Sequence, residues 1–317
     1  MTYFCANFTG TILSHPLTKF LLISPDTIMK FASNENGERR KAFSERHAMR
    51  IDLVAAQQVG TSTTDLCTSA RSSIRNILRR LHLQSRELIE ADLHDLWYTI
   101  YRCATITPGD NPEQDKLVVE VLMARELGAP SGGVETGDGT IFTDLPFFVM
   151  DMHDLKYRQQ GTITLDEAYN LAAFLARLVA VGVRAPQLSC LALQSLSAAL
   201  EFPSMPSLRE NDFATKTSTV ERLPAAVSWL KFAGHRLAIY SAEAQMTPCG
   251  KCLTDNDLEP GPLAQEAGVI DKGFGPARWN FWRQRFEELR EEEDEKRSEW
   301  ARRGANSMAL WSKLVGS

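Results

Sequence analysis

The fold is decided by one aromatic stretch, Phe274-Gly275-Pro276-Ala277-Arg278-Trp279-Asn280-Phe281-Trp282-Arg283-Gln284-Arg285-Phe286. Its thirteen residues hold two Trp, three Phe and three Arg, and the Gly-Pro step suits the start of a helix. Trp279, Trp282, Phe286 and Leu289 are spaced by 3, 4 and 3 residues, which places them on one helical face. Because buried aromatic side chains remove large areas from water, this helix is predicted to anchor the core. We expect it to continue through Glu287–Arg297 with a solvated, charged face.

The composition is that of an ordinary soluble globular protein, with 44% hydrophobic and 24% charged residues among 317. A net charge of −5, from 40 acidic and 35 basic residues, lacks the electrostatic footprint of a general nucleic-acid binder. The sequence contains no apolar run near the ~20 residues that a membrane-spanning helix needs. The apolar run Phe20–Ile23 is too short for a signal-peptide core, so we expect a cytoplasmic protein with reduced thiols.

Helical spacing of apolar residues recurs along most of the chain. It is clear in residues 65–82 and 84–105, and again after the Pro at position 112. Thr164-Leu165-Asp166-Glu167 fits a capping box, in which the hydroxyl and the carboxylate each satisfy a free backbone N–H at a helix start. No run alternates with the period of a strand. We therefore predict an all-α, compact multi-helix domain of about nine or ten helices.

Two long loops and one domain boundary are also predicted. The stretches near 129–140 and 245–276 are rich in Gly and Pro, which are typical of loops. Residues 1–60 are the least regular part of the sequence. They are predicted to form an irregular or partly helical N-terminal extension, followed by the all-α domain at 61–317.

Several segments occur in an order that resembles a known family. They are Thr143-Asp144-Leu145-Pro146, Asp151-Met152-His153-Asp154, Asn170–Leu178, Ala198–Glu201, Ala225–Leu230 and Gly273–Trp282. Over about residues 85–312 the chain is similar to a fungal family of uncharacterised proteins, the domain of unknown function 3632. The resemblance implies an all-helical fold and a fungal origin. Some members sit in secondary-metabolite gene clusters, but the family has no settled activity, so no mechanism is implied.

The first candidate site residues are acidic. Asp151 and Asp154 lie one helical turn apart, and two carboxylates at that spacing can share a metal or divide acid and base roles. The alternative is a solvated helix end beside a loop. We favour that alternative, because the sequence contains no second cluster of ligands.

A second pair lies inside a strongly apolar helix. Asn170 and Arg177 are seven residues apart and share nearly the same face. A buried Arg needs a partner, and Asp144 or Asp151 would serve. The functional interpretation is a polar pocket between helices, where ligand sites tend to lie. The alternative, which we favour, is a structural ion pair or an Arg that reaches solvent.

Arg278 and Trp279 occupy the first helical turn after a Gly/Pro-rich loop, so we take them as the edge of the same pocket. Phe174 and Trp282 would line it. The full candidate pocket is Asp144, Asp151, Asn170, Arg177, Arg278 and Trp279.

No metal or cofactor is predicted. Cys249-Gly250-Lys251-Cys252 supplies two ligands, whereas a structural zinc site needs four. The basic residues between Arg71 and Arg86 are interpreted as a solvated helix face, although they could bind phosphate. The common motifs of hydrolases, nucleotide-binding proteins and zinc peptidases are missing from the sequence.

Three functions stay open at this point. The leading hypothesis is a fungal accessory or binding protein, with secondary metabolism as its context and a hydrophobic small molecule or a protein as its partner. The second is an enzyme that acts on a hydrophobic small molecule in an interhelical pocket. It predicts a deep apolar cavity in which the polar side chains of Asp144, Asp151, Asn170 and Arg177 converge. The third is a helical scaffold with an exposed apolar patch for a protein partner.

Overall fold

The computed structural model describes residues 63–81, 83, 86–128, 134–158, 163–203, 219–245 and 258–315. The chain divides into two units, Met1–Leu53 and Val54–Ser317, and all described residues belong to the second. The predicted N-terminal extension at 1–60 and the Cys pair at 249 and 252 lie outside the described residues. The predicted boundary near residue 60 therefore stays a prediction.

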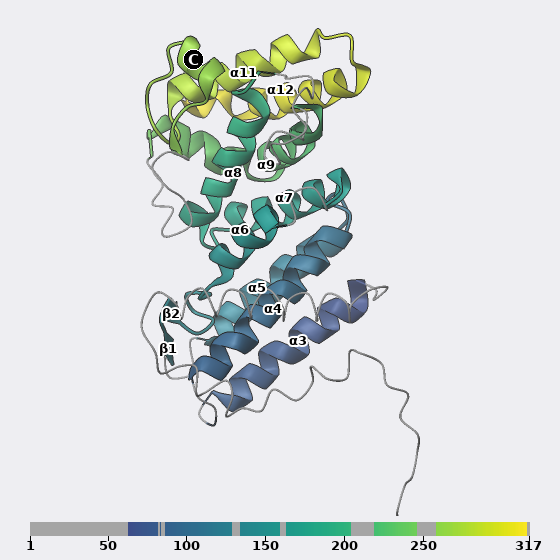
Figure 1. The fold of residues 1–317 in the computed structure, drawn as a ribbon, viewed down its shortest axis with the longest axis vertical. Coiled ribbons are helices and arrows are strands. Elements are labelled where there is room, and N and C mark those ends of the chain that lie inside the picture. Colours follow the sequence, from purple (N-terminus) through teal and green to yellow (C-terminus); the bar gives the residue numbers. More distant parts are fainter. Residues whose placement is uncertain are drawn as a thin grey trace, which may run out of the picture. The chain divides into compact units, whose positions relative to one another are not determined.

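The described residues form ten helices and one small hairpin, which confirms the all-α prediction (Figure 1). In chain order the elements are α3 (Thr63–Arg80), α4 (Arg86–Ile106), α5 (Glu113–Gly128), β1 (Glu135–Thr136), β2 (Gly139–Thr140), α6 (Phe148–Arg158), α7 (Leu165–Ala180), α8 (Ala185–Leu200), α9 (Thr219–Ala242), α10 (Pro262–Glu266), α11 (Pro276–Arg290) and α12 (Glu295–Val315).

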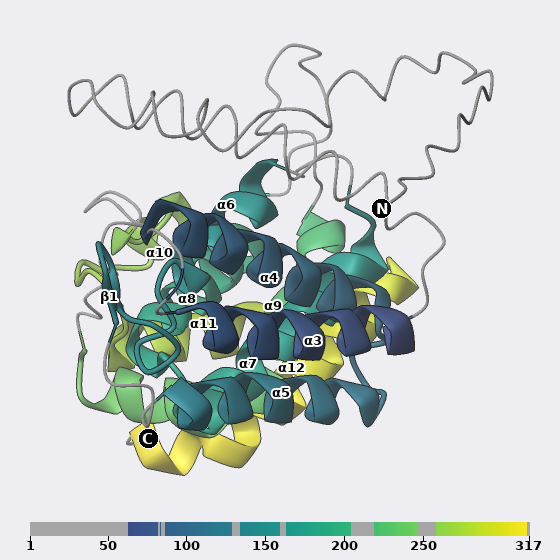
Figure 2. The same cartoon turned by 90° about the horizontal axis from the view of Figure 1, so that it is seen from below.

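Helix α7 lies at the centre of the helical unit. It packs against α4 and α5 on one side and against α8 and α9 on the other. Helix α12 packs against α9, and α11 packs against α12. Figure 2 shows α3, α4 and α5 running alongside one another. Because α7 has neighbours on both sides, every residue from Asn170 to Val179 is buried. Its start has the predicted capping box: Thr164 Oγ1 accepts from the Glu167 N–H at 3.2 Å, and the Glu167 carboxylate accepts from the Thr164 N–H at 2.9 Å.

The aromatic stretch packs as expected but its helix is shorter. Trp279, Trp282, Phe286 and Leu289 are all buried on one face of α11. The helix ends at Arg290, and α12 begins at Glu295. Asp294 starts the second helix, because its carboxylate accepts the Arg297 N–H at 3.1 Å. The single helix expected through Glu287–Arg297 is therefore two helices, and the turn between them lets α12 fold back onto α11.

The two predicted loops contain short regular elements. In 129–140, β1 and β2 pair antiparallel, with Glu135 opposite Thr140 and Thr136 opposite Gly139. Gly139 has a φ of 119°, a conformation that suits glycine at this tight turn. In 245–276, the five-residue helix α10 begins directly after Gly261 with Pro at its first position.

Candidate functional site

Arg278 forms an ion pair with Glu201 in the interior of the domain. The Nε–Oε1 distance is 2.7 Å and the Nη2–Oε2 distance is 2.9 Å, and the two side chains are 1% and 0% exposed. Arg278 also donates from Nη1 to the carbonyl oxygens of Leu258 and Gly273, at 2.8 and 2.9 Å, and from Nη2 to that of Glu259. The guanidinium thus holds the loop before α11 as well as the end of α8.

Glu201 is equally well supplied with hydrogen bonds. It accepts from Trp282 Nε1 at 2.7 Å, from Ser197 Oγ at 2.8 Å and from the Gly261 N–H at 2.6 Å. Burial alone would raise the pKa of this carboxyl, but the hydrogen bonds and charge of Arg278 outweigh burial and lower it. The network is therefore a buried ion pair in which the donor groups of Arg278 and the acceptor oxygens of Glu201 all have hydrogen-bond partners. The sequence pointed to Arg278 as a candidate site residue but not to Glu201. The available signal for Glu201 was an acidic residue at the end of an apolar helix.

The Asn170 side chain joins the turn between α4 and α5 to α7. Its Oδ1 accepts the Gly109 N–H at 2.6 Å, and its Nδ2 donates to the Thr105 carbonyl at 2.8 Å. Gln114, fully buried, donates to the carbonyls of Ala104 and Thr107 at 3.0 and 2.7 Å in the same turn. These bonds satisfy backbone groups that the turn would otherwise bury without partners.

Arg177 pairs with a residue other than those expected. Its Nε donates to Asp115 Oδ1 at 2.9 Å, its Nη1 donates to the Ala173 carbonyl, and its guanidinium lies 3.7 Å from the centre of the Phe232 ring. The predicted partners Asp144 and Asp151 are wrong, because α5 packs on α7 whereas α6 packs on α4 and α8.

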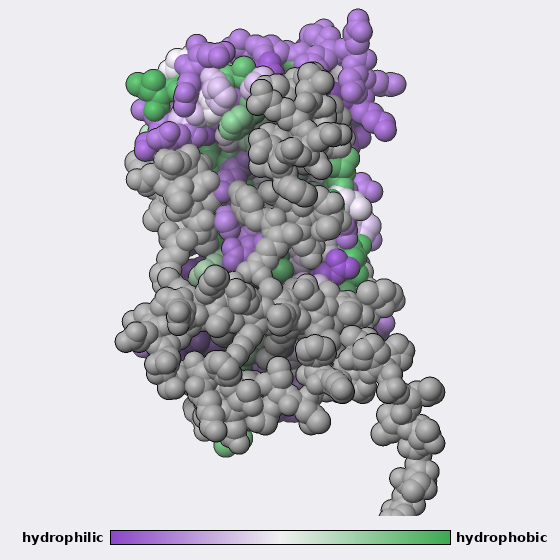
Figure 3. All heavy atoms as spheres, viewed as in Figure 1, coloured by the Kyte–Doolittle hydropathy of each residue, from purple (hydrophilic) through white to green (hydrophobic). Residues whose placement is uncertain are grey.

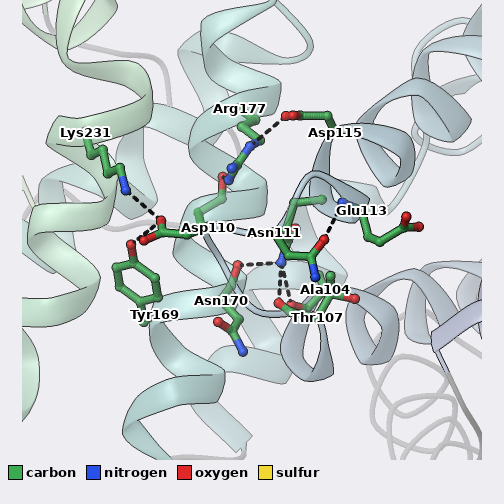
Figure 4. Close-up of polar contacts among 12 residues, drawn as sticks. Ala104, Thr107, Asp110, Asn111, Glu113, Asp115, Tyr169, Asn170, Arg177 and Lys231 are labelled. Atoms are coloured by element: carbon green, nitrogen blue, oxygen red, sulfur yellow. Dashed lines mark hydrogen bonds and ion pairs between the residues drawn. The ribbon is translucent and has the colours of Figure 1, made fainter.

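Asp110, in the turn between α4 and α5, links α7 to α9. It accepts from Tyr169 Oη of α7 and from Lys231 Nζ of α9, each at 2.7 Å (Figure 4). Burial opposes ionisation of Asp110, but the hydrogen bonds from Lys231 and Tyr169 prevail and lower its pKa. Burial and the bond to Asp110 raise the pKa of Tyr169. At neutral pH Asp110 is therefore a carboxylate that accepts hydrogen bonds from Lys231 and from the un-ionised Tyr169 hydroxyl.

The acidic residues near α6 have separate environments. Asp151 is buried, and its Oδ2 lies 2.7 Å from His94 Nδ1 of α4. Asp154 is exposed, and its closest ionic contact is with His153 at 3.4 Å. Asp144 accepts the Thr140 N–H at 2.8 Å and so closes the hairpin. Within the ranges that the structure describes, no group of three or more His, Cys, Asp or Glu is placed to hold a metal ion.

The six predicted pocket residues thus lie in three places, each with its own hydrogen-bond or packing partners. Asp144 and Asp151 belong to the hairpin and α6, Asn170 and Arg177 to α7, and Arg278 and Trp279 to the buried start of α11. Their role as a ligand pocket stays a prediction.

A groove lies on the opposite face of α11. It has a volume of about 300 Å³ and is lined by Ala267, Gly268, Val269, Ala277, Asn280, Phe281, Arg283 and Gln284. We call it the α10–α11 groove. Val269 and Phe281 supply an apolar floor, and Asn280, Arg283 and Gln284 supply a polar rim.

Arg283 is an exposed cation with no ion pair to any described residue. Its neighbours one turn along the helix are engaged elsewhere: Glu287 pairs with Arg290 at 2.7 Å, and Glu288 pairs with Arg285 and accepts from Gln284. The groove therefore offers a guanidinium that is available to an outside anion.

A second groove, of about 290 Å³, lies on α12 and contains Trp300. Arg303 lies 4.8 Å from the centre of the Trp300 ring and pairs with Glu299 at 2.8 Å. The surface over α11 and α12 that faces the viewer in Figure 3 is largely hydrophilic. Arg302 and Arg303 of α12 thus both pair with Glu299, unlike Arg283, which has no ion pair among the described residues.

The fold and these networks define a helical protein in which the buried side chains of Glu201, Arg278 and Arg177 each have an ion-pair partner. Comparison with protein families identifies its family. A family model described as "Protein of unknown function (DUF3632)" matches residues 97–286, and the chain belongs to this family. The predicted resemblance is confirmed. The matched range includes α7, the Glu201–Arg278 pair and all the residues that line the α10–α11 groove.

The chain is also similar to "Oxopyrrolidines biosynthesis cluster protein G" of Penicillium oxalicum (strain 114-2 / CGMCC 5302). The two are 30% identical over 221 residues, which is 63% of this chain and 60% of the relative. The chain thus spans about 60% of that protein's length. No solved structure matches it. None of the helices in the described ranges combines the length and the apolar character needed to cross a membrane.

Proposed function

We propose that this protein is an accessory protein of a fungal biosynthetic pathway that binds a small amphipathic anion in the α10–α11 groove. The observation that carries the proposal is Arg283, an exposed guanidinium beside an apolar floor that has no ion pair among the described residues. Apolar pockets with a few placed polar groups are typical of small-molecule sites, and a volume of about 300 Å³ is at the small end of their range. The printed name of the Penicillium relative supports the pathway context.

The predicted pocket residues have a supporting part in this proposal. Arg278 and Trp279 lie on the buried face of α11, opposite Ala277, Asn280 and Gln284, which face the groove. The Glu201–Arg278 pair holds the start of α11 against the preceding loop, and so it positions both walls of the groove. The polar side chains of Asn170, Arg177 and Arg278 are all hydrogen-bonded to other residues of this protein. This supports a binding role for the protein over catalysis by these three side chains.

Fluorescence titration tests the groove with a matched pair of probes. 1-Anilinonaphthalene-8-sulfonate carries an aryl body and a negative charge, and N-phenyl-1-naphthylamine is the same body without the sulfonate. We expect Arg283→Gln to weaken sulfonate binding about five- to tenfold, which is about 1–1.4 kcal/mol, because one charge-assisted hydrogen bond is lost. Binding of the neutral probe should change less than about twofold.

Two further variants complete the test. Ala277→Trp should weaken both probes, because it fills the groove from an exposed position. Arg79→Gln, at an exposed Arg of α3, should match the unaltered protein. Unchanged sulfonate affinity in both Arg283→Gln and Ala277→Trp would refute the groove as the site. Native mass spectrometry of the protein purified from a fungal host would then show whether another organic anion is bound elsewhere.

The cytoplasmic location predicted from the sequence belongs to the same proposal. Fractionation of fungal cells that produce a tagged full-length protein tests it, and recovery in the culture medium would contradict it.

A further inference from the structure

Two cysteines from different helices meet between α3 and α4. The Sγ atoms of Cys67 and Cys103 are 3.7 Å apart, although the residues are 36 positions apart in the chain. Both are free thiols, whereas Cys190 in α8 is disulfide-bonded, which contradicts the expectation of reduced thiols for Cys190. An S–S bond is about 2.05 Å long, so a movement of less than about 2 Å would join the pair.

The two thiols have different accessibility and acidity. Cys103 is wholly buried, whereas Cys67 is partly exposed. The contact with Cys103 lowers the pKa of Cys67, burial and the carboxylates of Glu120 and Glu113 oppose this shift, and Arg71 assists it. The contact with Cys67 and burial raise the pKa of Cys103. An accessible, more acidic thiol beside a buried, protonated one is the arrangement of an attacking and a resolving cysteine.

Arg71 and Glu120 complete the surroundings. Arg71 lies one helical turn after Cys67 and donates from Nε to Glu120 Oε2 of α5 at 3.0 Å. This ion pair keeps a cation near the Cys67 sulfur while its own charge is balanced. The same contacts hold α3 in place, so the two sulfurs stay within reach of each other.

We propose that Cys67 and Cys103 form a modification site that is oxidised by a hydroperoxide to a disulfide between α3 and α4. The Cys67 thiolate attacks the peroxide, the O–O bond breaks, and the leaving oxygen takes a proton and departs as water or an alcohol. Cys67 is now a sulfenic acid, oxidised by two electrons, and the peroxide is reduced by two. The Cys103 sulfur then attacks the Cys67 sulfur, the S–S bond forms, the S–O bond breaks, and the oxygen leaves as water with the Cys103 proton.

Peptide mapping of the full-length protein tests this inference, which does not rest on the proposed function. The protein is treated with one equivalent of hydrogen peroxide, alkylated and digested with trypsin without reductant. We expect a linked species of peptides 51–71 and 103–116 that dithiothreitol separates. We also expect the melting temperature to rise by about 5 °C on oxidation, because the bond joins two helices.

Variants make the outcome decisive. Cys67→Ser should lose the linked species, and Cys103→Ser should leave Cys67 as a sulfenic acid that dimedone labels. The double variant Cys249→Ser/Cys252→Ser should form the link as the unaltered protein does. If the unaltered protein gives no 51–71 to 103–116 species, or if Cys67 is found only as sulfinic acid, the proposal is wrong, and this result does not depend on whether any variant folds.

Discussion

At the scale of single residues, Glu201 and Arg278 act as one unit. Both charges are fully buried. Glu201 accepts hydrogen bonds from α8, the 258–273 segment and α11, and Arg278 donates to Glu201 and to carbonyls of the 258–273 segment. A buried pair of this kind contributes little net stability compared with apolar residues, yet it is costly to break from one side. The Arg177–Asp115 pair differs, because the Asp115 side chain is 69% exposed and solvent screens the attraction.

We expect Glu201→Gln to lower the free energy of unfolding by about 3–5 kcal/mol, because Arg278 would stay buried without a countercharge. Urea denaturation followed by circular dichroism measures this. Glu299→Gln, at a surface carboxylate, should change stability by less than about 0.5 kcal/mol. The double variant Glu201→Met/Arg278→Met should recover only part of the loss, because groups such as Trp282 Nε1 and the Leu258 carbonyl would stay buried without hydrogen bonds. A Glu201→Gln protein as stable as the unaltered one would show that the pair is dispensable.

At the scale of elements, two glycines set how closely α12 approaches its neighbours. A Cβ added at Gly304 would overlap the ring of Phe286 in α11, and one added at Gly234 of α9 would overlap the indole of Trp311 in α12. The turn at 291–294 makes the first contact feasible, since it lets α12 return along α11. The close packing of these helices therefore depends on glycine, which has no side chain, at positions 234 and 304 as much as on the aromatic rings of Phe286 and Trp311.

Gly304→Ala is therefore expected to destabilise the protein by about 1–3 kcal/mol, although Ala favours a helix over Gly by about 1 kcal/mol. Thermal melts would show the loss as a lower midpoint. Asn306→Ala, at an exposed position of the same helix, should be neutral or slightly stabilising. A higher melting temperature for Gly304→Ala would mean that Phe286 can move aside without loss.

At the scale of the whole molecule, stability depends on carboxylates that bind several elements together. Asp110 and Glu201 have pKa values lowered below the ordinary 3.8 and 4.5 by hydrogen bonds from Lys231 and Arg278 that prevail over burial. A lowered pKa means that the folded state binds protons less readily than the unfolded state. Their contributions are thus present above these ordinary values and are lost as pH falls through the lower folded values.

The urea midpoint is accordingly expected to fall steeply below about pH 4.5. Burial lowers the pKa of His235 from its ordinary value of 6.5. His235 therefore adds a smaller loss of stability on acidification, which begins as the pH falls below about 6.5. Denaturation series between pH 7 and pH 3 would measure the slope, and Glu201→Gln should have a shallower one. A midpoint that rises on acidification would contradict these assignments.

Local features of this protein were readable from the sequence, because each depends on residues within a few turns. The spacing of Trp279, Trp282 and Phe286 predicted the buried face of α11, and Thr164 with Glu167 predicted the start of α7. The order of short segments also predicted the family. The break after Arg290 was missed, since Asp294 is hidden in a charged run that suits a continuous solvated helix.

The tertiary structure alone decided the partners of the polar residues. Arg278 pairs with Glu201 across 77 positions, Arg177 with Asp115 across 62, and Asp151 with His94 across 57. Each pairing follows from which helices pack together, and helical spacing carries no information about that choice. The sequence by itself thus determined the helices and their buried faces, because backbone hydrogen bonding and side-chain burial are local in the chain. Packing decided which charges are paired inside and left Arg283 available at the surface.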